Sequence, residues 1–118
     1  MKKQTKASLK RKLDKIFSEV IRKRGYCERC GESTHSKLQC SHIHSRDKLS
    51  VRWDLKNAFC LCGGCHIFWW HKNPVLAAEF SREKLGEYEY VALLHRANSI
   101  KKWTIPEMQE LLKTLEKL

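Results

Sequence analysis

A pair of Cys-x-x-Cys motifs, separated by 31 residues, constrains the fold of this chain more than any other feature. The cysteines of these motifs are Cys27, Cys30, Cys62 and Cys65. A tight turn of this length presents two thiolates to one ion, and two such turns complete the tetrahedral coordination that zinc prefers. Gly31 and the Gly63-Gly64 pair supply the backbone freedom that the turns need. We therefore expect one structural Zn²⁺ ion, bound by the four cysteines.

The length and the charge narrow the class of protein. A chain of 118 residues is expected to form a single domain (residues 1–118), small enough for a bound metal to contribute to its stability. It has 24 Lys and Arg residues against 13 Asp and Glu residues, a net charge of +11. Such a surplus favours a polyanionic partner, and nucleic acid is the usual one. The alternative interpretation is a basic protein without such a partner.

The remaining cysteines and the N-terminus bear on the compartment. Met1-Lys2-Lys3 leads into an amphipathic segment rather than an apolar leader, and no run of about 18 apolar residues occurs. We therefore expect a cytoplasmic protein with no membrane contact, in a reducing compartment where cysteines bind metal rather than form disulfides. Cys40 and Cys60 are interpreted as small buried hydrophobic residues, with Cys60 a weak competitor for the metal.

Residues 1–25 are expected to form a basic N-terminal helix. Apolar residues of segment 8–24 recur at helical spacing, Lys and Arg occupy the opposite face, and Gly25 follows as a helix terminator. The basic face is either a solvated surface or a phosphate contact.

Residues 73–118 are expected to form C-terminal helices. Asn73-Pro74 is a cap followed by proline at the first helical position, which predicts a helix to about residue 85, closed by Gly86. A further helix is predicted over about 87–97. Thr104 and Glu107 have capping-box spacing and start a last helix. Its apolar stripe, interpreted either as core or as the seam of a homodimer, consists of Met108, Leu111, Leu112, Leu115 and Leu118.

Residues 26–72 differ in kind from both flanks. Up to residue 66 they are rich in Cys, His, Gly, Ser and Asn, with short strand-like pieces at 37–44 and 50–53. This composition is typical of a hairpin organised by a metal ion, which replaces a hydrophobic core. The sequence therefore predicts an α+β fold, in which a small zinc-bound core (26–72) is flanked by helices.

Polar residues between the two cysteine motifs suggest more than a zinc ribbon. Ser41-His42-Ile43-His44 lies on the first strand-like piece, Asn57 lies five residues before Cys62, and His66 directly follows Cys65. The stretch Asn57–His66 resembles the second half of an HNH motif, and Ser41-His42-Ile43 resembles its first half. This resemblance covers about residues 27–71. It implies a ββα-metal (His-Me finger) core and the activity of a metal-dependent DNA endonuclease.

A narrower resemblance covers most of the chain. Four segments together are similar to phage recombination nucleases of the NinG (Rap) type: 12–18, 41–46, 51–54 and 65–71. This resemblance implies a phage or prophage origin, a bacterial host cell, and action on branched or recombining DNA. Nonspecific nicking, or cutting linked to DNA packaging, is the alternative.

The HNH resemblance implies a role for each polar position. His42 is predicted to be the general base, since a neutral imidazole activates water near pH 7. His66 is predicted to bind a catalytic Mg²⁺ or Mn²⁺ ion from the start of a helix, and to meet His42 across that ion. Asn57 is predicted to orient the base and its loop through amide hydrogen bonds. The predicted catalytic residues are therefore His42, Asn57 and His66.

The position before His42 departs from the family pattern. Many HNH members have Asp or His there as a metal ligand, whereas this chain has Ser41, a poor ligand. Either the ion has one protein ligand fewer, or Asp54 or His44 supplies it, and Mg²⁺ would prefer the Asp54 carboxylate. The predicted DNA contacts are His44, Arg46, Arg52 and His71, with the two arginines as phosphate clamps.

A second function class explains part of the sequence. A non-catalytic zinc-ribbon module that binds nucleic acid accounts for the cysteines and the charge, but not for the offsets of the HNH-like residues. His35 and His95 are interpreted as ordinary packed or surface histidines. The aromatic run 68–70 is interpreted as helix packing, with stacking on unpaired bases as the lesser alternative.

Overall fold

The computed structural model describes residues 4–118, apart from the side chain of His35. Met1-Lys2-Lys3, on which the expectation of no leader rested, lies outside the described residues. The structure is a small α+β fold with one two-stranded antiparallel sheet. Its main elements are α1 (Lys6–Arg22), β1 (Leu38–His42), β2 (Ala58–Cys62), the π-helical segment η3 (Cys65–Trp70), α2 (Pro74–Leu85), α3 (Glu87–Ala97) and α4 (Ile105–Glu116). Short 3-10 turns cover His35–Lys37 and Leu55–Asn57.

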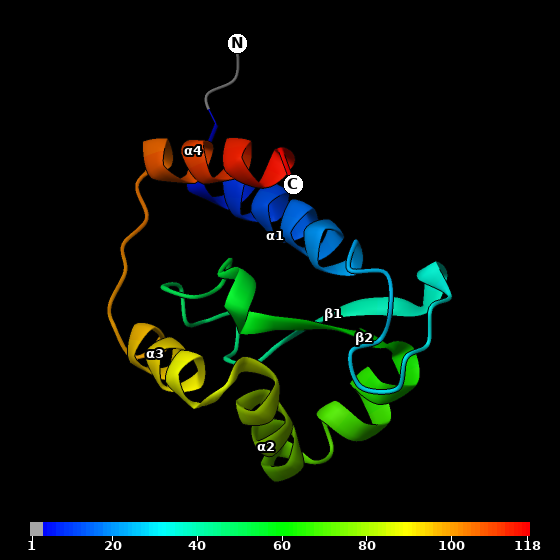
Figure 1. Ribbon diagram of the computed structural model, residues 1–118. Helices are drawn as coiled ribbons and strands as arrows, with labels where there is room; N and C mark the ends of the chain where they lie inside the picture. Colours follow the sequence, from blue (N-terminus) through cyan, green and yellow to red (C-terminus); the bar gives the residue numbers. More distant parts are fainter. Residues whose placement is uncertain (1–3) are drawn as a thin grey trace.

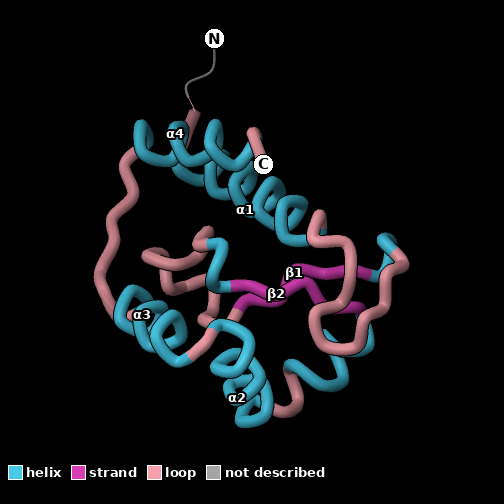
Figure 2. Tube along the Cα trace, viewed as in Figure 1, coloured by secondary structure: helices cyan, strands magenta, loops and turns pink. Residues whose placement is uncertain are grey.

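The β1–β2 hairpin lies between two helical layers (Figure 1). Helices α1 and α4 pack side by side over one face of the hairpin, while η3, α2 and α3 lie on the other side. Long loops join α1 to β1 and β1 to β2, so much of the region around the sheet is irregular (Figure 2). The α+β fold class with flanking helices, predicted from the sequence, is therefore confirmed.

Local capping signals define the outer helices. The Thr5 hydroxyl accepts a hydrogen bond from the Ser8 amide, and the Ser8 hydroxyl receives one from the Thr5 amide, so α1 begins with a capping box. Gly25, at φ +86°, follows the end of α1 and its amide donates to the Arg22 carbonyl, as expected of a helix terminator. Helix α4 begins with the predicted capping box of Thr104 and Glu107.

Asn73 is at the predicted N-cap position of α2 but lacks the bond of a cap. Pro74 begins α2 as expected, but Asn73 makes no side-chain capping bond. The side-chain Nδ2 of Asn73 instead donates to the Trp69 carbonyl at 3.1 Å. This carbonyl lies at the end of the preceding η3 segment, so the side chain stabilises the end of one helix rather than the start of the next.

The second predicted strand is wrong. Segment 50–53 forms turns, and the partner of β1 is Ala58–Cys62. Strand β2 shows no alternation of buried and exposed residues, because four of its five residues are buried. A strand covered on both faces has a continuous apolar run instead. The first strand-like piece is confirmed, with β1 shorter than predicted by one residue at its start and two at its end.

The register of the hairpin assigns its side chains to two faces. His42 pairs with Ala58, Ser41 with Phe59, and Cys40 with Cys60. Phe59 packs edge-to-face against Trp70 of η3 and Phe80 of α2, so this face of the sheet meets the lower helical layer. Because side chains alternate along a strand, Ser41 lies on that face and His42 on the face towards α1.

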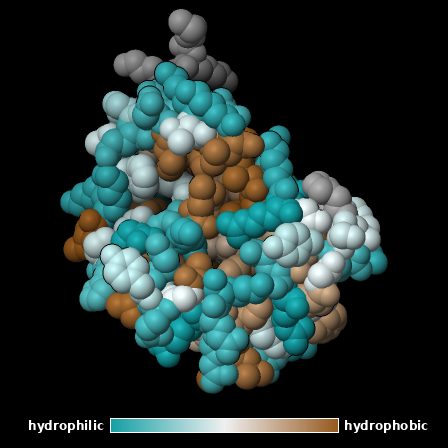
Figure 3. Space-filling model, viewed as in Figure 1, coloured by the Kyte–Doolittle hydropathy of each residue, from teal (hydrophilic) through white to brown (hydrophobic). Residues whose placement is uncertain are grey.

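Helix α4 completes the core rather than leaving its apolar stripe exposed. Met108 is fully buried and Leu115 nearly so, both within the cluster formed with α1, whereas Leu118 is 53% exposed. Figure 3 shows apolar residues gathered between the α1–α4 pair and the centre of the molecule, with hydrophilic residues around them. No helix in the described part of the chain combines the length and apolar character needed to cross a membrane.

Candidate metal centre and histidine cluster

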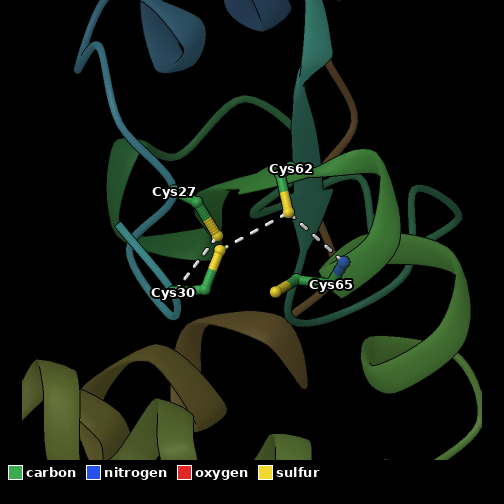
Figure 4. A group of neighbouring side chains, drawn as sticks. All are labelled: Cys27, Cys30, Cys62 and Cys65. Carbon is green, nitrogen blue, oxygen red and sulfur yellow. Dashed lines mark hydrogen bonds between the residues drawn. The ribbon is translucent and has the colours of Figure 1, made fainter. Parts of the chain in front are cut away.

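The four motif cysteines meet at one end of the hairpin. Cys27 and Cys30 lie in the loop after α1, Cys62 ends β2, and Cys65 begins η3. All four sulfur atoms lie within 4.8 Å of one another (Figure 4). Sulfurs around a tetrahedral zinc ion lie about 3.8 Å apart, given zinc–sulfur bonds of about 2.3 Å. The cluster can therefore hold a metal ion such as zinc, as the sequence predicted.

The backbone of each turn supports its own thiolates. The Cys30 amide donates to Cys27 Sγ at 3.4 Å, and the Cys65 amide donates to Cys62 Sγ at 3.5 Å. Gly31 has φ +84°, a backbone conformation that side chains rarely adopt, which explains a glycine directly after the first turn. Arg29 Nη1 also donates to Cys65 Sγ at 3.4 Å.

The thiols are not equivalent in acidity. Burial disfavours ionisation of Cys27, but hydrogen bonds from the amides of Cys30, Cys62 and Arg29 outweigh it and lower its pKa to about 7. Burial, aided by the neighbouring sulfurs, raises the pKa of Cys65 to about 12. One thiolate therefore forms readily, whereas ionisation of all four requires a cation to offset the accumulated negative charge.

His66, directly after the cysteine cluster, contacts Ser41 and His71. The Ser41 hydroxyl lies 2.5 Å from His66 Nδ1, and His66 Nε2 lies 3.1 Å from His71 Nε2. The π-helical backbone brings the two histidines together, because the His71 amide bonds to the His66 carbonyl five residues earlier. Burial, followed by the neighbouring His71 and His42, lowers the pKa of His66.

His42 lies on the opposite face of β1 from Ser41. Its ring packs against Phe17 of α1, with ring centroids 5.4 Å apart, and its Nε2 lies 3.1 Å from the Arg52 carbonyl oxygen. A carbonyl oxygen only accepts, so Nε2 carries the proton and Nδ1 keeps a lone pair. Burial lowers the pKa of His42, although the bond to the carbonyl favours the protonated form. The neutral imidazole is thus the form favoured near pH 7.

Asn57 is fully buried and holds the loop that joins the two strands. Its Oδ1 accepts from the His44 amide at 2.8 Å, while its Nδ2 donates to the carbonyls of His44 and Val51, each at 3.0 Å. These bonds fix both ends of the loop segment 44–51. They are amide hydrogen bonds to a loop next to His42, the kind of role that the HNH resemblance implies for this position.

The predicted DNA contacts differ in exposure. His71 and Arg46 are exposed, with 61% of the Arg46 side chain accessible. His44 is half-buried, burial lowers its pKa, and its Nε2 is the one buried side-chain nitrogen or oxygen without a partner in the described chain. Arg52 is largely buried against Asp14, and all three of its guanidinium nitrogens donate to protein acceptors.

Asp54, the suggested oxygen ligand, has other partners. One carboxylate oxygen accepts from the Lys56 amide at 2.9 Å and the other pairs with Arg96 at 2.9 Å. Across the described residues, the four cysteines are the only group of three or more His, Cys, Asp or Glu side chains with converging ligand atoms. The structure therefore does not bring Asp54 to His66.

Sequence reasoning missed two contributors to this region. Asp14 accepts hydrogen bonds from residues almost forty positions away, and nothing in the local sequence of this predominantly basic helix indicates this. The pairing of His66 with His71 was missed because residues five apart lie on one side only in a π-helix, which no local signal predicts. The two histidines five residues apart were the only available indication.

The chain has no significant match among protein-family models, curated proteins or solved structures. The resemblance to HNH nucleases consequently depends on the motif residues themselves.

Proposed function

We propose that this protein is a metal-dependent DNA endonuclease with an HNH-like ββα-metal core. The observation that carries the proposal is the cluster at one end of the hairpin. There Ser41 of β1 contacts the His66–His71 pair, and the residue after it, a neutral His42 with a free Nδ1, lies on the opposite face of the strand. The net charge of +11 supports a polyanionic substrate.

The His66–His71 pair suits a divalent ion. Their Nε2 atoms are 3.1 Å apart, close to the separation of about 3 Å between adjacent ligands of an octahedral ion with bonds of about 2.1 Å. If Nε2 held the ion, His66 Nδ1 would carry the proton and donate it to the Ser41 hydroxyl, which would fix the ring. Ser41 would then hold the metal ligand His66 through a hydrogen bond and would not need to bind the ion itself. Two imidazoles suit Mn²⁺ better than Mg²⁺.

The chain's own groups supply the rest of a hydrolytic site. His42 Nδ1 takes a proton from the attacking water, with the imidazole held by the Arg52 carbonyl. Asn57 fixes the loop segment 44–51, which directly precedes this carbonyl, through its bonds to residues at both ends. Arg46, whose side chain is 61% exposed and lies 3.8 Å from Asp14 Oδ2, offers a guanidinium for a phosphate. When bound, the divalent ion supplies Lewis-acid stabilisation of the phosphate charge and of the leaving oxygen.

The proposed substrate is branched or recombining DNA, in a phage or prophage context. This part rests on the resemblance to NinG-type nucleases. Nonspecific nicking is the alternative, and the choice of DNA substrates in the test below separates the two.

A non-catalytic zinc-ribbon module that binds nucleic acid is the second candidate. One observation favours it: within the described chain, no carboxylate converges on the His66–His71 pair, so a catalytic ion there has two protein ligands. The cysteine cluster and the positive charge fit either function.

The test is cleavage of labelled linear duplex, nicked duplex and four-way-junction DNA by the zinc-loaded protein, with and without added Mg²⁺ or Mn²⁺. We expect metal-dependent cutting that prefers the junction. His42→Ala should reduce cutting by about 10²- to 10⁴-fold while DNA affinity is retained. His95→Ala, which changes an exposed histidine of α3, is the matched control and should cut normally. A folded, zinc-loaded protein that binds all three DNAs and cuts none would establish the binding module instead.

A further inference from the structure

Asp14 is one of two acidic residues in the predominantly basic helix α1, and it binds the loop beyond His42. Its Oδ1 accepts from Arg52 Nε at 3.0 Å and from Trp53 Nε1 at 2.9 Å, while its Oδ2 accepts from Arg52 Nη2 at 2.7 Å. The Arg52 guanidinium thus meets both carboxylate oxygens. Such a two-point contact fixes the orientation of an arginine as well as its position.

The rest of Arg52 is also held. Its Nη1 donates to the Arg46 carbonyl at 3.1 Å, so each guanidinium nitrogen has a protein acceptor, and 18% of the side chain is exposed. An arginine engaged in this way has little freedom to clamp a phosphate. The contact of Arg52 with the histidine is made by its backbone, because its carbonyl accepts a hydrogen bond from His42 Nε2.

Helix α1 therefore reaches His42 by two routes. Phe17, one turn after Asp14, packs directly against the His42 ring. Asp14 holds Arg52, and the Arg52 carbonyl holds the proton on Nε2 of the same ring. The first contact sets the plane of the imidazole, and the second selects its tautomer.

We propose that Asp14 is a positioning residue which, through Arg52, keeps His42 in the tautomer that leaves Nδ1 free. The consequence for catalysis rests on the proposed nuclease function. The effect on the His42 tautomer does not, because it follows from the hydrogen bonds alone. Removal of the carboxylate frees the Arg52 guanidinium, relaxes the backbone at residue 52, and lets the His42 ring exchange tautomers or rotate.

The tautomer is measured by two-bond ¹H–¹⁵N correlation spectra of the zinc-loaded protein with ¹⁵N-labelled histidine. In the wild type we expect His42 with the proton on Nε2. In Asp14→Asn we expect a mixed or inverted tautomer, and a fall in kcat on DNA of about tenfold or more with KM little changed. Arg52→Lys, which keeps the charge but loses the two-point contact, should reproduce both effects. The double variant should be no worse than either single variant.

Two control variants separate this role from general stabilisation. Trp53→Phe removes the indole bond to Asp14, together with part of the buried ring that packs against Trp103, and should leave the tautomer unchanged. Glu87→Gln breaks the ion pair with Arg82, 3.1 Å long and on the opposite helical layer, and should change neither readout.

An unchanged His42 tautomer in both Asp14→Asn and Arg52→Lys would overturn the proposal, whether or not cutting declined. A wild-type protein that cuts no DNA would refute the nuclease function, and the spectra would still decide the role of Asp14.

Discussion

The Asn57→Ala substitution tests the hydrogen bonds that hold the loop between the strands. It removes a fully buried amide together with all three of its bonds, to the amide and carbonyl of His44 and to the carbonyl of Val51. None of these three bonds goes to a residue of the four α-helices or of the cysteine cluster. The expected loss is therefore local in origin, although it acts on the stability of the whole fold.

The magnitude follows from the fate of each partner. A net contribution of about 1 kcal/mol for each hydrogen bond gives roughly 3 kcal/mol in total. The Val51 carbonyl keeps its bond from the Asp54 amide at 3.1 Å, and the two partly buried groups of His44 can recover water, so none of the three partners is left without a hydrogen bond. We expect the free energy of unfolding to fall by about 2–4 kcal/mol, a large part of the 5–15 kcal/mol typical of small domains.

The assay is urea unfolding of the zinc-saturated protein, followed by tryptophan fluorescence. With a slope of about 1–3 kcal/mol per molar urea, the midpoint should shift by roughly 1–2 M. Asn98→Ala, at an exposed position just after α3, is the matched control and should change stability by no more than about 0.5 kcal/mol. If Asn57→Ala lost less than about 1 kcal/mol, the three bonds would not hold the loop as argued.

Three further predictions concern pH, metal and the last helix. Burial lowers the pKa values of His42 and His44 below 6.5, so the unfolded chain binds more protons than the native state in acid. Unfolding experiments should show stability falling as the pH drops below about 6.5, with a smaller fall in His44→Phe; stability that rises on acidification would contradict this. Elemental analysis should find one zinc ion per chain, which Cys62→Ser should lose together with cooperative thermal unfolding; an equally stable metal-free protein would argue against a structural metal. Deletion of α4 removes the buried Met108 and Leu115 and should abolish folding by circular dichroism, whereas a folded monomer would favour a dimer seam.

The elements that could be located from the sequence are those whose boundaries are set by interactions between residues close together in the chain. The capping box at Thr104 and the proline at the start of α2 depend on bonds and dihedral angles within a few residues, so they can be recognised without tertiary contacts. The cysteine cluster was equally predictable, because the Cys-x-x-Cys spacing itself forms each half of it. Strand β2 was misplaced because a strand covered on both faces loses the alternating pattern that identifies one exposed to water.

By itself, the sequence determined the helices, the cysteine cluster and the presence of chemically capable histidines. Only the tertiary structure decided the partners of those side chains. Because side chains alternate along β1, Ser41 rather than His42 contacts His66. Tertiary packing brings Arg52 to Asp14, 38 residues away in the sequence. Asp54 paired with Arg96 instead of joining the histidines. Backbone preferences act over a few residues, whereas the partner of a polar side chain depends on which segments the packed core brings together.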